Sequence, residues 1–334
     1  MLIHFENIVG MLIRITFDQE PVMLKERFIL RGVSGILAAF LLVAAACSDD
    51  SVPTSEGATT IVQLSLSGLK PLETGFNYQA WVIQGYYAYP LGIFNFNENG
   101  KMVDVSRDSL LSGEFTAYLG LDKITDIAIS IEHQDVMVTA PSYALILGGA
   151  VSEGQAALTI ENQVGIGVSF EGAAGKYILA TPTDSINTDE NSGIWFLDLT
   201  TGISLNGFNL PELPAGWEYE GWVIQNDTYL STGKFSQFTA ADESADYSGP
   251  VAGPPFPGED FLENAPGGLS FPINLAGASV MITVEPWNGY DDNEEEPFFL
   301  NVLVADIPPD AADHITYDMN ASNDHLPTGT ATLK

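Results

Sequence analysis

Residues 78–84 read YQAWVIQ and residues 219–225 read YEGWVIQ, so the chain carries one short pattern twice. The two copies are 141 positions apart, from Tyr78 to Tyr219. The same offset, without a gap, aligns further identical pairs: Leu64 and Leu205, Leu69 and Leu210, Leu72 and Leu213, Gly75 and Gly216, Gly92 and Gly233, and Phe94 and Phe235. Matches at a single offset indicate an internal duplication, which predicts two copies of one structural unit.

Short strands punctuated by turn residues dominate both copies. Residues 61–66 and 127–132 alternate apolar and polar side chains, and residues 143–147 form a continuous apolar run that ends at two glycines. Asn99-Gly100 favours a tight hairpin turn after residues 91–96. With no long helical periodicity, the pattern predicts an all-β protein of two tandem antiparallel, immunoglobulin-like β-sandwiches, at residues 61–160 and 161–334.

The repeated tryptophan has a structural and a functional interpretation. In an extended residue 78–84 segment, Tyr78, Ala80 and Val82 point to one side, and Trp81 lies on the other. Domains without disulfides depend on large aromatic side chains for buried area, so we expect Trp81 to fill the core. The alternative is a stacking platform for a sugar or a base.

The second repeat contains extra segments. An acidic loop at 184–192 is flanked by residues 177–182 and 194–199, and this pattern predicts a hairpin with a long tip. Other segments match the first repeat: residues 280–285 correspond to 127–132, and residues 297–304 correspond to 141–147. Residues 329–333 resemble 154–158, which predicts that each domain closes with an equivalent strand.

A proline- and glycine-rich insertion at residues 248–261 follows the second copy. This composition excludes the interior of a sheet and predicts a long surface loop, the kind of segment in which binding residues concentrate. Phe256 and Phe261 in this loop either cap the sandwich core or contact a partner. The insertion is therefore the first place where we look for function.

The N-terminal region resembles a bacterial lipoprotein signal peptide. Basic residues after Met23 precede an apolar run from Gly32 to Ala46, and Cys47, the only cysteine, follows directly. Acidic residues ahead of Met23 favour Met23 as the true start. The resemblance predicts a signal peptide at 1–46, lipidation of Cys47 and a flexible tether at 47–60. An uncleaved membrane span is the alternative.

The residues just after Cys47 indicate where in the cell the protein is located. Ser48 in the second mature position resembles the outer-membrane sorting pattern, and Asp49-Asp50 resembles the signal that some Gram-negative lipoproteins use to reach the cell surface. We therefore expect a lipid-anchored outer-membrane protein that faces the periplasm or the cell surface.

Charge restricts the class of partner. The chain has 44 acidic and 11 basic residues, for a net charge of −33, yet 46% of its residues are hydrophobic. The apolar content places it among folded proteins, and the acidic surface repels phosphate backbones. The composition thus excludes nucleic acid and leaves another envelope protein as the expected partner.

Both repeats resemble the extracytoplasmic C-terminal domain of the anti-sigma-K factor family. The second copy carries the pattern in Trp222, Gly233, Phe235 and Glu285-Pro286, and the first has His133 in place of the proline. The resemblance implies a β-sandwich outside the cytoplasm. It does not imply sigma-factor binding, because nothing corresponding to the family's cytoplasmic helical domain precedes Cys47.

The sequence contains few candidates for catalytic or metal-binding residues. The histidines lack metal-ligand spacing, and neither a nucleophile elbow nor a phosphate loop occurs. Acidic loops suit calcium, and the best candidate is Asp291, Asp292 and Glu294. We therefore expect a non-enzymatic, anti-sigma-factor-like envelope lipoprotein that binds or scaffolds, without a catalytic residue or an obligatory cofactor.

The alternative function is an extracellular glycan-binding lipoprotein. It would use exposed aromatic side chains such as Trp217, Trp287, Tyr86, Tyr87 and Tyr89. A row of coplanar, exposed rings on one face would favour this alternative, and their burial would exclude it.

Overall fold

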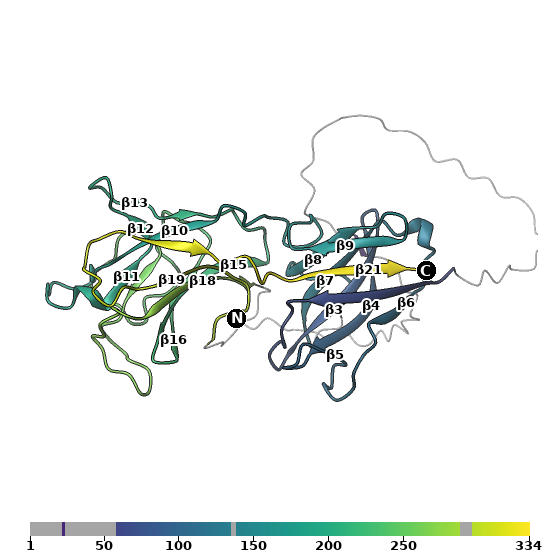
Figure 1. Ribbon diagram of the computed structural model, residues 1–334, viewed down its shortest axis with the longest axis horizontal. Coiled ribbons are helices and arrows are strands. Elements are labelled where there is room, and N and C mark those ends of the chain that lie inside the picture. Colours follow the sequence, from purple (N-terminus) through teal and green to yellow (C-terminus); the bar gives the residue numbers. More distant parts are fainter. Residues whose placement is uncertain (1–21, 24–57, 135–137, 288–295) are drawn as a thin grey trace, which may run out of the picture.

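The computed structural model describes residues 22–23, 58–134, 138–287 and 296–334. In these residues the secondary structure consists of β-strands and two short 3₁₀ turns, η1 (Leu121–Lys123) and η2 (Glu190–Ser192). The strands form two lobes side by side along the long axis of the molecule (Figure 1). The predicted all-β, antiparallel fold class is confirmed. The described residues contain no helix of the length and hydropathy that a membrane span requires.

The first lobe is built on one antiparallel sheet that folds over its own core. In spatial order its strands are β1 (Val22–Met23), β4 (Tyr87–Phe96), β3 (Phe76–Gln84), β7 (Asp126–His133), β8 (Leu145–Ala150), β9 (Gln155–Thr159), β21 (Thr328–Leu333), β2 (Thr60–Ser67) and β6 (Glu114–Ala117), with β5 (Met102–Val103) beside β4. Phe94 of β4 contacts Phe115 of β6, with ring centroids 6.1 Å apart. Strands from opposite ends of the sheet therefore face each other across the core.

The second lobe repeats this plan with additions. Its sheet runs β16 (Thr228–Phe235), β15 (Trp217–Gln225), β18 (Ser279–Pro286), β19 (Asn301–Asp306), β20 (Tyr317–Ala321), β10 (Ala174–Leu179), β11 (Gly193–Trp195) and β17 (Gly258–Asp260); β14 (Phe208–Asn209) pairs with β10, and β12 (Leu197–Asp198) pairs with β13 (Leu205–Asn206). Antiparallel pairing of β10 with β11 confirms the predicted hairpin across the acidic loop.

The duplication extends to individual contacts around the central strands β3 and β15. The Tyr78 hydroxyl donates to the Lys70 carbonyl at 2.9 Å, and the Tyr219 hydroxyl donates to the equivalent Pro211 carbonyl at 2.7 Å. Each tyrosine stacks on the phenylalanine of its Gly-x-Phe pattern, Phe94 or Phe235, with centroids 5.7 Å apart in both lobes. The pairing of each central strand with the strand that follows it also shifts register at the same place, beside the tryptophan.

Trp81 is fully buried, as expected, but it lies outside the main core. Tyr78, Ala80 and Val82 face the main core, whereas Trp81 and Ile83 lie on the other face in a smaller cluster, under Val138 and Val164. Residues after β7 and β9 thus cover the outer face of the sheet. Both faces of β3 are therefore buried. Side chains that alternate in direction along residues 78–84 enter two different cores, and neither set faces solvent.

The last strand, β21, belongs to the first lobe. It leaves the second lobe and runs through the first to residue 334, as the yellow arrow in Figure 1 shows. Its residues pair with β2 from Val62 to Ser67 and with β9 from Gln155 to Thr159. Residues 154–158 and 329–333 therefore do not close two separate domains, because they pair with each other in one sheet. The apolar pattern that they share reflects a common environment on that sheet.

We predict that β21 is required for the stability of the first lobe, and two adjacent residues test this. Ala331 is 1% exposed, whereas Thr330 is exposed on the opposite face of the same strand. Ala331→Asp buries an unpaired carboxylate and should lower the free energy of unfolding by about 3 kcal/mol or more, whereas Thr330→Asp should lower it by about 1 kcal/mol or less. Denaturant unfolding measures both, and equal effects would contradict this assignment.

Candidate functional site

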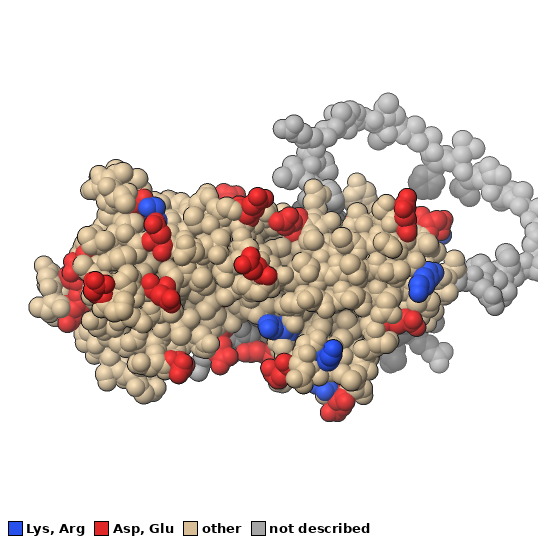
Figure 2. All heavy atoms as spheres, in the orientation of Figure 1, with Lys and Arg blue, Asp and Glu red and all other residues tan. Residues whose placement is uncertain are grey.

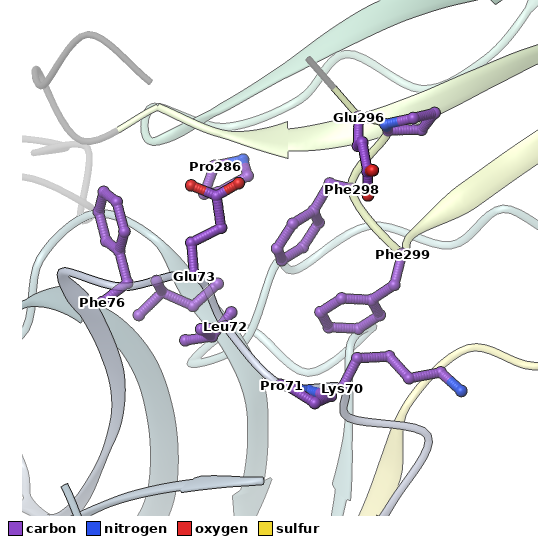
Figure 3. Close-up of a pocket in the computed structure, with 11 residues that line it drawn as sticks. Lys70, Pro71, Leu72, Glu73, Phe76, Pro286, Glu296, Phe298 and Phe299 are labelled. Atoms are coloured by element: carbon purple, nitrogen blue, oxygen red, sulfur yellow. The ribbon is translucent and has the colours of Figure 1, made fainter. Parts of the chain in front are cut away.

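A cavity of about 220 Å³ lies where the two lobes meet. The first lobe contributes Lys70, Pro71, Leu72, Glu73, Phe76 and Ile131, and the second contributes Pro286, Glu296, Pro297, Phe298 and Phe299. In Figure 3 the rings of Phe298 and Phe299 point toward the segment that carries Leu72 and Glu73, and Phe76 lies on the far side of Glu73. The same view places the carboxylates of Glu73 and Glu296 on either side of Phe298. This junction pocket is the candidate functional site.

The wall from the first lobe is held by hydrogen bonds to its backbone. Arg107 donates from Nη2 to the carbonyl oxygens of Leu72 and Glu73, at 2.7 Å each. The Leu72 N–H donates to Asn95 Oδ1 at 3.0 Å, inside the lobe. These bonds, with that from Tyr78 to Lys70, fix residues 70–76 without using their side chains. Lys70 and Glu73 are therefore exposed on a rigid support.

The wall from the second lobe is held by a buried carboxylate. Trp222 Nε1 donates to Thr283 Oγ1 at 3.0 Å, the Thr283 hydroxyl donates to Glu285, and Glu285 Oε1 accepts the Phe298 N–H at 3.1 Å. The first lobe repeats the chain through Trp81, Ser130, Glu132 and the Ser142 N–H. Phe298 in turn packs on Phe299, with centroids 4.3 Å apart.

Burial raises the pKa of these two glutamates. Burial of the Glu285 carboxyl, reinforced by the negative charge of Glu220, raises its pKa from 4.5 to about 8. Burial also raises the pKa of Glu132, against the lowering effect of its hydrogen bonds to Ser130 and Ser142. Glu285 is therefore protonated in the folded protein at neutral pH.

Equivalent corners of the two repeats differ in their contact with the other lobe. The Gly75 carbonyl accepts the Gln134 N–H at 2.6 Å, and the equivalent Gly216 carbonyl accepts the Trp287 N–H at 2.8 Å. Gly216 also abuts the first lobe, because a Cβ atom there would lie 2.4 Å from the backbone of Tyr143. Nothing lies within 4 Å of the corresponding position on Gly75. The duplication thus generates two similar corners, of which one is an interface.

The predicted partner contacts in the insertion are buried. Phe261 is 0% exposed in the main core, and Phe256 is 7% exposed against Trp195. Neither ring is presented to a partner, and capping of the core is the interpretation that the structure bears out. The insertion also ends in a strand, β17, which pairs with β11 at the edge of the sheet. The prolines of the insertion all precede this strand, which begins at Gly258.

The insertion buries the carboxyl groups of Glu259 and Asp260, and that of Asp242 beside it is half-buried. Asp260 accepts hydrogen bonds from Trp195 Nε1 at 2.7 Å and from the Thr183 N–H at 2.8 Å, and Asp242 accepts the Gly258 N–H at 2.7 Å. Burial raises the pKa of Asp242 and of Glu259 to about 7 each, and it also raises the pKa of Asp260. The hydrogen bonds of Asp260 and Asp242 attach the insertion to the rest of the lobe.

The remaining predicted site residues are not placed. Cys47 and the calcium candidates Asp291, Asp292 and Glu294 lie outside the described residues. In the described part of the chain, no three histidine, cysteine or acidic side chains are grouped for a metal ion.

The aromatic residues of the glycan alternative do not share one platform. Trp217 is 2% exposed and Trp287 is 53% exposed at the junction. Tyr86 and Tyr87 are exposed at the other end of β3, roughly 30 Å from its junction end at Phe76. Exposed rings this far apart cannot bind one short sugar chain together.

Comparison of the chain with models of known protein families, with curated proteins and with solved structures found no match. The resemblance to the anti-sigma-K extracytoplasmic domain therefore stays a prediction.

The sequence analysis missed the junction pocket. Its signal was present in the repeat, since Gly75 and Gly216 are identical at the common offset and each precedes a long central strand. The repeat does not reveal that the two corners face each other, because that depends on the path of β21 between the lobes.

We predict that Gly216→Ala weakens the junction more than Gly75→Ala does. Both glycines have positive φ, +95° and +108°, so alanine strains the backbone in both. Only the Gly216 variant also clashes with Tyr143. Its free energy of unfolding should fall by at least about 1 kcal/mol more than that of the Gly75 variant. Denaturant unfolding provides the comparison, and equal losses would show that the close contact has no energetic weight.

We predict that stability falls as pH rises from about 5 to 8. Between 4.5 and about 8 the folded state keeps the Glu285 proton and the unfolded state does not, so raising the pH favours unfolding. Glu285→Gln should reduce this slope and be more stable than the wild type at pH 8. Melting temperatures across this range measure the effect, with the exposed Glu263→Gln as the control. A slope unchanged in Glu285→Gln would contradict the assignment.

Proposed function

We propose that this chain is a non-enzymatic lipoprotein of the bacterial cell envelope, anchored through Cys47, whose tandem sandwiches bind or scaffold another envelope protein. The sequence resemblances support the anchor, the outer-membrane location and the anti-sigma-factor-like architecture without a sigma-binding part. The proposal assigns the junction pocket, rather than the insertion, as the contact site.

The observation that carries this proposal is the position of residue 61, at the outer pole of the first lobe. The Ile61 N–H donates to the Lys334 carbonyl and the Lys334 N–H donates to the Ile61 carbonyl, both at 2.9 Å. The described chain thus enters the first lobe and finishes β21 at one pole, far from the second lobe in Figure 1. An anchor ahead of residue 61 would hold the first lobe at the membrane and project the second lobe outward.

The junction itself suits a scaffold. The chain passes from the first lobe to the second after β9 and returns in β21, so two connections join the lobes. Buried apolar side chains from both lobes form one continuous cluster. Such a junction resists bending, and a site between the lobes keeps its shape when a partner pulls on the second lobe.

Acidic residues outnumber basic ones on the visible face of both lobes (Figure 2). Figure 2 shows carboxylates distributed over the visible face, with few lysine and arginine side chains among them. A surface of this kind speeds association with basic partners and disfavours other polyanions. The charge therefore supports a protein partner with a basic contact surface.

We predict that the protein is labelled by a fatty-acid analogue and that Cys47→Ala abolishes the label, because acylation requires the thiol. The measurement is in-gel detection after metabolic labelling in a Gram-negative host, followed by membrane fractionation. Ser48→Ala is the control, and it should keep the label. An unlabelled Cys47→Ala protein that still fractionates with membranes would reject lipid anchoring and favour a membrane span.

A further inference from the structure

We propose that the junction pocket binds a lysine or arginine side chain of the partner protein. This inference rests on the proposed binding function and specifies the chemistry of its contact.

The first argument is the pair of carboxylates. Glu73 comes from the first lobe and Glu296 from the second, and both side chains are exposed. Figure 3 shows them on opposite sides of the Phe298 ring, with the Lys70 ammonium directed away from both. Within the described part of the chain, no ion pair occupies either glutamate. The pocket thus carries one carboxylate from each lobe.

The second argument is the aromatic lining. Phe76, Phe298 and Phe299 supply ring faces and edges to the same cavity, while Pro286 and Pro297 supply apolar walls. A cation over a ring face is attracted by the negative potential of the ring, and the aliphatic stem of lysine or arginine packs on apolar surface. A carboxylate or phosphate ligand would face repulsion from both glutamates.

The third argument is preorganisation. The backbone of 72–73 is held by Arg107, and Phe298 is held by the buried Glu285, so neither wall needs to be ordered on binding. A cavity of about 220 Å³ has room for one long side chain rather than for a helix or an extended strand. Rigid walls reduce the entropic cost of binding a single anchor residue.

A direct test uses a fluorescent peptide of alternating glycine and arginine, with citrulline in place of arginine as the neutral, equally sized comparison. Binding to the full mature chain is measured by fluorescence anisotropy at low and at physiological salt. We expect the arginine peptide to bind at least about 10-fold more tightly than the citrulline peptide. Equal binding of the two peptides would overturn the inference.

Matched variants separate the pocket from the general acidic field. Glu73→Gln with Glu296→Gln removes two negative charges at the junction, and Glu114→Gln with Glu263→Gln removes two exposed charges elsewhere on the same lobes. We expect about 10-fold weaker binding for the first pair and less than about twofold for the second. Phe299→Leu, which removes a ring and keeps apolar bulk, should weaken binding several-fold. Equal losses in both pairs would overturn the inference.

A pull-down from the native envelope distinguishes this inference from the proposed function. Suppose that the wild-type protein captures a partner, that the Glu73→Gln, Glu296→Gln variant does not, and that the control variant does. This result would support both the pocket assignment and the proposed binding function. A partner kept equally by all three proteins would overturn the pocket assignment and leave the binding function standing. Tight, pocket-dependent binding of the arginine peptide with no envelope protein captured would reject the proposed function alone.

Discussion

The backbone pairing of β21 between β2 and β9 is the interaction on which the architecture depends. It fills the middle of the first sheet with a strand that the chain supplies only after it has built the second lobe. The first lobe therefore cannot complete its hydrogen-bond ladder until the second has been traversed. Such a long-range pairing costs loop-closure entropy, and in return it gives the two lobes a second covalent connection.

The repeated cores show how an acidic protein tolerates carboxyl groups in its interior. Each lobe places a tryptophan N–H, a hydroxyl and a glutamate in one chain of hydrogen bonds that ends on a backbone N–H. A buried carboxylate would be costly if it were charged and unpaired, and burial accordingly raises the pKa of both glutamates, which favours their neutral form. The network fixes neighbouring segments, which in the second lobe include a wall of the junction pocket.

At the junction, the two repeats supply similar structures that make different contacts. The two repeats offer similar corners at Gly75 and Gly216, yet only the latter packs against the other lobe. The pocket arises because one corner from each repeat is turned toward the other, which gives it a glutamate from each side. A single copy of the domain would present only half of this lining. The proposed binding site therefore requires both repeats.

By itself, the sequence determined the local structure: the duplication, the strands around Trp81 and Trp222, the Asn99-Gly100 turn and the β10–β11 hairpin. These follow from periodicity and turn chemistry, which act over a few residues. The tertiary structure decided that β21 joins the first sheet, that Phe256 and Phe261 are buried, and that Glu73 and Glu296 line one pocket. These relations connect residues far apart in the chain, and a local pattern specifies which face of a strand is apolar but not which distant strand will cover it.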